Sequence, residues 1–167
     1  DAASQDTGTL TQWCLEPKTS ATASYSIGGT ATGIAGSGLT LSLNGGAALP
    51  VAAGAAAFTF PTSLASGTPY TVAVASQPTA PSQTCTLTNP TGTVSGANVV
   101  NVGVSCTTST FSVGGTVAGM TGSGLALSLN GGANFVVNAN GGFTFPNTVA
   151  SGAAYTVTIA AQPTSPA

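Results

Sequence analysis

The sequence predicts an all-β protein built from two tandem modules, and three observations support this. Residues 36–46 return at 122–132, with Thr40 replaced by Ala126 as the only difference, so the chain repeats itself with a period of about 86 residues. Apolar residues alternate with Thr and Ser, which is the pattern of half-buried strands. Turn residues separate these alternating runs, and no segment shows the 3.6-residue periodicity of a helix.

The repeat continues on both sides of this stretch. The matching segments begin at Tyr25 and Phe111, at Phe58 and Phe143, and at Tyr70 and Tyr155. The offset falls from 86 to 85 within the repeat, where a loop tolerates the loss of a residue. We therefore expect an N-terminal extension (1–24), a first module (25–108, repeat one) and a second module (109–167, repeat two).

Repeat one is expected to contain seven short strands. Asn44-Gly45 is a strong hairpin signal, because both residues accept positive φ. Pro61 is expected to end the strand that carries Phe58 and Phe60, and a turn is expected at 90–92. The expected strands are 24–31, 39–43, 49–52, 58–60, 70–74, 83–89 and 97–106. This number and spacing of strands favour an immunoglobulin-like β-sandwich.

The alanine run 52–57 has high helix propensity when read alone. Its counterpart in repeat two, 137–142, contains Asn-Ala-Asn-Gly-Gly and is a turn signal. Because both copies should adopt the same fold, we expect strand–turn–strand in each.

Repeat two matches repeat one only as far as Gln162-Pro163. The counterpart of Cys85 would fall at position 170, beyond Ala167. The second module is therefore expected to lack its last two strands within this sequence.

Charged residues are nearly absent. They make up 2% of the 167 residues, against roughly 25% in a typical soluble domain. All of them precede residue 19: Asp1, Asp6, Glu16 and Lys18. This composition favours self-association and excludes nucleic-acid binding, since no basic patch exists. No apolar run is long enough to span a membrane.

The repeats offer no catalytic or metal-binding set. They contain no His, Asp, Glu, Lys or Arg, so a Ser nucleophile has no base and a metal lacks carboxylate or imidazole ligands. The glycine pairs Gly28-Gly29 and Gly114-Gly115 precede no helix, so we expect a bulge or bend in the first strand of each repeat and not a phosphate loop. We expect no enzyme activity and no cofactor.

Several motifs resemble a repeat found in bacterial secreted and surface proteins. They are Phe111-Ser-Val-Gly-Gly-Thr-Val, Gly-Ser-Gly-Leu with Leu-Asn-Gly-Gly, Phe-Thr-Phe, and the Gln83-Thr-Cys strand followed by a Val-rich strand ending in Cys106. The resemblance covers residues 25–167 and implies an exported, immunoglobulin-like or prealbumin-like sandwich. It carries no catalytic residues.

Cys85 and Cys106 lie in the last two expected strands of repeat one, and we expect a disulfide between them. A disulfide implies an oxidising compartment, so we expect an extracellular or bacterial cell-surface location. Cys14 is the odd cysteine, which suggests intermolecular pairing or a free thiol. The many Ser and Thr hydroxyls could also carry O-linked sugar.

Two hypotheses on function remain open at this point. In the first, the protein is a subunit of a surface filament, and the extension of one copy completes repeat two of the next by strand donation. The expected interface residues are Leu10, Gln12, Trp13, Cys14 and Leu15 of the donor and Tyr155, Val157 and Ile159 of the acceptor. In the second, the sequence is a stalk or spacer segment of a larger secreted protein or adhesin. A carbohydrate-binding module ranks last, because most aromatic residues occupy alternating core positions.

Overall fold

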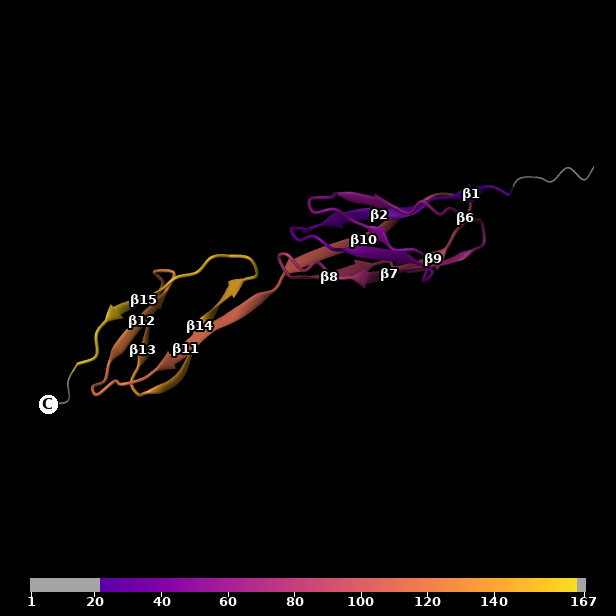
Figure 1. Ribbon diagram of the computed structural model, residues 1–167. Helices are drawn as coiled ribbons and strands as arrows, with labels where there is room; N and C mark the ends of the chain where they lie inside the picture. The colour runs from indigo at the N-terminus through magenta and orange to yellow at the C-terminus, as the bar shows by residue number, and fades with distance from the viewer. Residues whose placement is uncertain (1–21, 165–167) are drawn as a thin grey trace, which may run out of the picture.

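The computed structural model describes residues 22–164, which form strands, turns and loops with no helix among them (Figure 1). The all-β prediction is therefore confirmed for this part of the chain. The described residues include no helix that could span a membrane. The expected strand around Trp13 lies outside the described residues.

Repeat one forms two four-stranded sheets and one short two-stranded pair. The sheet orders are β5-β2-β10-β8 and β4-β3-β7-β9, and β1 pairs with β6. The strands are β1 (Ser24–Tyr25), β2 (Ile27–Thr32), β3 (Thr40–Leu43), β4 (Leu49–Pro50), β5 (Ala57–Thr59), β6 (Leu64–Ala65), β7 (Pro69–Ser76), β8 (Gln83–Thr88), β9 (Thr91–Thr93) and β10 (Val99–Thr108). Buried side chains from both sheets share a single core cluster.

Repeat two forms a two-stranded sheet, β11-β14, and a three-stranded sheet, β13-β12-β15. The strands are β11 (Thr110–Val117), β12 (Leu125–Leu129), β13 (Asn134–Val137), β14 (Gly141–Ala150) and β15 (Val157–Ala161). A second, smaller core cluster joins these two sheets, and it contains Val113, Leu127 and Phe145. The domain boundary at 108/109 stays a prediction, and the two core clusters lie on opposite sides of it.

The repeated sequence produces repeated local structure. Asn44 and Asn130 have φ of 50° and 52°, and the glycine after each has φ of 69°, so both Asn-Gly pairs form the expected tight hairpins. The start of each repeat also has the same register, because Ser24 pairs with Ala65 as Thr110 pairs with Ala150.

Three details differ from the sequence expectations. The first expected strand is interrupted at Ser26, and its halves β1 and β2 pair with different neighbours. The expected turn at 90–92 is mostly strand β9, because its backbone pairs with β7. Pro146, the counterpart of Pro61, does not end its strand. It lies within β14 at the point where the register to β11 shifts, and at such an irregularity the sheet does not need a backbone N–H, which proline lacks.

The alanine run is not helical, as expected, and contains a turn before β5.

A single residue, Ser109, separates β10 of repeat one from β11 of repeat two (Figure 1). The Ser109 N–H donates to the backbone oxygen of Ser82, and the Ser151 N–H donates to the backbone oxygen of Ser109. The N–H of Ser82 donates in turn to Oγ of Ser151, at 3.0 Å. These bonds fix the start of β11 to the last strands of repeat one.

Candidate functional site

The predicted acceptor residues lie on an exposed surface of repeat two. Tyr155, Val157 and Ile159 are 56%, 42% and 57% exposed. Their counterparts in repeat one, Tyr70 and Val72, are 6% and 2% exposed, and Val74 is partly buried. The same apolar pattern is therefore covered in one repeat and uncovered in the other.

In repeat one, strand β9 and the residues after it lie beside Tyr70, at the start of this pattern. Tyr70 pairs with Gly92, and the Tyr70 ring lies against that glycine so closely that an added Cβ would be 2.7 Å from the phenol oxygen. Val94 is 1% exposed, and its N–H donates to the backbone oxygen of Thr68. No described residue of repeat two takes these places beside Tyr155.

The edge of β11 is open in the same repeat. In repeat one, β2 lies between β5 and β10, whereas β11 pairs with β14 alone among the described residues. Phe111 at the start of β11 is 55% exposed, while its counterpart Tyr25 packs against the core. An open edge presents unpaired backbone N–H and C=O groups to which a further strand can bind.

Two matched glycines indicate where a strand that pairs with the open edge of β11 would lie. A Cβ on Gly29 would collide with the backbone oxygen of Val102 in β10, so the parallel neighbour requires glycine here. The counterpart Gly115 has only ring atoms of Phe143 near its Cβ position, at 3.2 Å. Repeat two thus keeps the glycine while the side that β10 occupies in repeat one is free of other described residues.

A groove of about 340 Å³ joins these features. Phe111, Val113, Val149 and Tyr155 line it, so the exposed Tyr155 and the open β11 edge belong to a single surface. We call this surface, with Val157 and Ile159, the open face of repeat two. Its side chains are apolar or hydroxylated, and no charged residue occurs between Thr19 and Ala167. Such a face suits a β-strand, and Tyr155 is the only titratable side chain on it.

The remaining predicted residues fall into two sets. Cys85 and Cys106 form a disulfide, the pairing expected from the sequence, and they are directly opposite each other in β8 and β10. Leu10, Gln12, Trp13, Cys14 and Leu15 lie outside the described residues. Among the described residues there is no cluster of His, Cys, Asp or Glu that could hold a metal ion.

Sequence reasoning missed Phe111 as part of the site. The sequence analysis placed most aromatic residues at alternating core positions and did not single out Phe111. A comparison of the strands beside the two residues could have found it, since β10 pairs with the strand after Tyr25 and no described strand takes that place beside β11. None of the family models, curated proteins or solved structures compared with the chain matches it.

Proposed function

We propose that this is a non-enzymatic structural protein of an extracellular surface fibre. Each chain contributes two immunoglobulin-like β-sandwich modules, and chains join head to tail. The open face of repeat two accepts β-strands from the extension (1–24) of a second copy. The resemblance to bacterial surface repeats is the reason for placing this fibre on a cell surface.

The observation that carries the proposal is the burial of matched residues. Tyr155 and Val157 are more than 40% exposed, while Tyr70 and Val72 are buried under strands of their own repeat. Burying apolar area is worth roughly 25 cal/mol per Å², so covering the open face favours association. Backbone pairing along β11 also fixes the position of a donated strand, because the N–H and C=O groups of that strand must match those of β11.

The chain geometry also supports head-to-tail order. Strand β10 lies between β2 and β8 in the sheet of repeat one and then leads directly into β11. In the sequence, the extension directly precedes the first strands of repeat one. A donor strand that lies where β10 lies would place the next chain in line with the first, as an open polymer requires.

The first prediction tests the open face. Ile159→Asp should abolish fibres, because the carboxylate would be buried without a partner, whereas the chain should still fold since Ile159 is 57% exposed. Sedimentation and electron microscopy of the purified full chain measure the outcome. Val100→Asp is the matched control, because Val100 in β10 is 70% exposed and lies outside the open face.

Two results would contradict the proposal. Wild-type protein that stays monomeric at its native concentration would overturn it, as would Ile159→Asp fibres of normal length. The alternative, a stalk segment of a larger protein, predicts a native mass well above 15.8 kDa and a further Gln-X-Cys segment in the same chain.

A further inference from the structure

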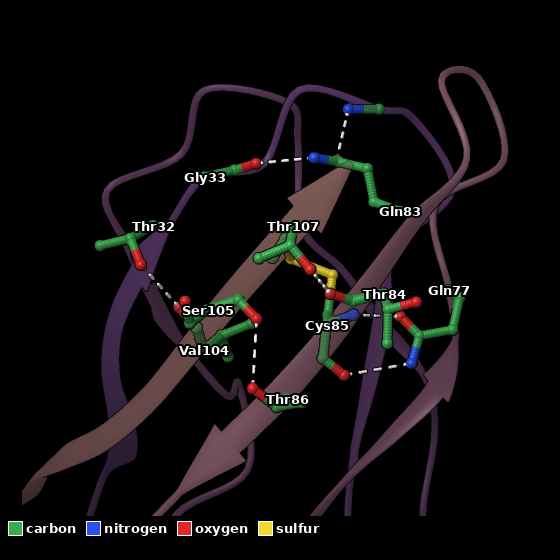
Figure 2. The surroundings of a disulfide bond; sticks show 12 residues. Thr32, Gly33, Gln77, Gln83, Thr84, Cys85, Thr86, Val104, Ser105 and Thr107 are labelled. Atoms are coloured by element: carbon green, nitrogen blue, oxygen red, sulfur yellow. Dashed lines mark hydrogen bonds between the residues drawn. A yellow bond between two sulfur atoms is a disulfide. The ribbon is translucent and has the colours of Figure 1, made fainter. Parts of the chain in front are cut away.

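Two glutamine side chains hold β8 in repeat one (Figure 2). The amide of Gln77 binds the backbone of Cys85 twice: its Oε1 accepts from the Cys85 N–H at 2.7 Å and its Nε2 donates to the Cys85 oxygen at 3.1 Å. Gln83 is 3% exposed and binds the loop 33–36. Its Oε1 accepts from the N–H of Ala35 and Gly36, at 2.9 and 2.7 Å, and its Nε2 donates to the Gly33 oxygen at 2.8 Å.

Repeat two contains the counterparts of the groups that hold β8, namely Gln162 and the loop 119–122, and we call these groups the receptor. Gln162 corresponds to Gln77, is exposed, and its amide has no hydrogen-bond partner among residues 22–164. The loop 119–122 corresponds to 33–36. The N–H groups of Thr121 and Gly122, the counterparts of Ala35 and Gly36, have no acceptor within the described chain. A buried N–H or amide without a partner costs free energy, so these groups gain most from a matching ligand once the face is covered.

The receptor loop already has the geometry seen in repeat one. Gly33 and Gly119 share a φ of 72°. The loops are also placed alike, because the Thr164 N–H donates to the Ser123 oxygen at 2.9 Å and the Thr79 N–H donates to the Ser37 oxygen at 3.1 Å. The binding groups are therefore preorganised.

The chain contains this ligand twice. Gln-X-Cys occurs as Gln83-Thr84-Cys85, which occupies the receptor of repeat one, and as Gln12-Trp13-Cys14 in the extension. We infer that Gln12-Trp13-Cys14 of a second copy docks on repeat two in the place that β8 has in repeat one. Gln12 binds the loop 119–122, and Gln162 binds the backbone of Cys14. This inference rests on the proposed function and adds the register of the donated segment.

The length of the extension agrees with this register. In repeat one, Gln83 pairs with Thr108, two residues before β11 begins. The same arrangement pairs Gln12 with Thr22, two residues before β1 begins. The segment between them then forms a hairpin that turns at 16–18, Glu-Pro-Lys. Proline and charged residues suit a turn, so one short extension can donate two strands, which take the places of the first part of β8 and of residues 105–108 of β10.

The test uses fibres of the full chain. Gln12→Ala and Gln162→Ala should each raise the concentration needed for assembly on the order of tenfold, the effect of losing about 1.4 kcal/mol of hydrogen bonding. The control, Asn147→Ala on the exposed side of β14, should leave it unchanged. Hydrogen–deuterium exchange then reports on the receptor directly. The amides of 121–122 should be protected in wild-type fibres and exchange at least tenfold faster in Gln12→Ala fibres.

The outcomes separate this inference from the proposed function. Fibres whose assembly and exchange do not respond to Gln12→Ala or Gln162→Ala would overturn the register and leave strand donation standing. Protection of 121–122 in wild-type monomers would show that a segment of the same chain occupies the receptor, and it would also overturn the inference. If wild-type protein forms no fibres, the proposed function itself fails.

Discussion

The glycine pairs Gly28-Gly29 and Gly114-Gly115 allow the adjacent strands of their sheets to approach closely. Gly28 and Gly29 lie in β2 between β5 and β10, where a side chain at either position would strike the backbone of the adjacent strand. Gly114 meets the equivalent neighbour, β14, and Gly115 faces the open side of β11. Sequence alone predicted a bend at both pairs. The structure shows close strand approach as the reason for glycine at Gly29.

Alanine substitution at the matched positions should separate folding from assembly. Gly29→Ala should destabilise the chain by about 2 kcal/mol or more, because the Cβ collides with the Val102 oxygen and the sheet must shift. Gly115→Ala should change the unfolding free energy by less than about 1 kcal/mol, since only ring atoms of Phe143 lie nearby. It should nevertheless impair fibre formation. Urea unfolding and sedimentation measure the two effects, and equal stability losses at both positions would contradict this account.

Other residues were predictable because their conformation is set locally. Asn44-Gly45 and Asn130-Gly131 needed only their own φ preferences to form hairpins. The exposure of Tyr155 and Ile159 was harder to predict, because alternation gives the face of a strand and says nothing about what covers that face. Only the comparison of two copies revealed the difference.

At the scale of elements, the sequence predicted the order of the main strands and missed their interruptions. Strand β9 contains Thr91-Gly92-Thr93, which has turn composition, yet pairing with β7 makes it extended. This is a tertiary effect that local propensity does not contain. The break at Ser26 has a similar origin, since the Ser26 N–H binds the side chain of Asn98, 72 residues later.

The disulfide makes β8 and β10 a covalent unit. Replacing both Cys85 and Cys106 by alanine should lower the unfolding free energy by about 3 kcal/mol, as expected for a closed segment with a separation of 21 residues. Cys14→Ala is the control and should leave stability unchanged, because Cys14 lies outside both repeats. Urea unfolding followed by circular dichroism provides the values. A loss below about 1 kcal/mol for the double variant would show that the disulfide contributes little to this fold.

At the scale of the whole molecule, stability should be nearly independent of pH. The pH dependence of the unfolding free energy follows the difference in bound protons between the unfolded and folded states. From Thr19 to Ala167 no Asp, Glu, His, Lys or Arg is present, so this difference is close to zero between pH 5 and about 8. The denaturant concentration at the unfolding midpoint should therefore stay the same between pH 5 and about 8.

Chemical unfolding of the full chain at several pH values checks this prediction. The unfolding free energy should vary by less than about 0.5 kcal/mol across the range, and 0.5 M sodium chloride should change it little because no charge pairs exist in the repeats to be screened. Uptake of a single proton on unfolding would instead produce a slope of about 1.4 kcal/mol per pH unit, which would contradict the prediction.

The passage of β10 into β11 has a consequence for tension along the molecule. Strands β2 and β10 are parallel neighbours, so the start of β2 and the end of β10 lie at opposite ends of the ladder between them. A pull on the two termini of repeat one therefore loads the bonds of that ladder together and in shear, and does not open them one at a time. The load then crosses Ser109 through covalent backbone into repeat two. In repeat one, strand direction and not ion pairing therefore opposes the pull.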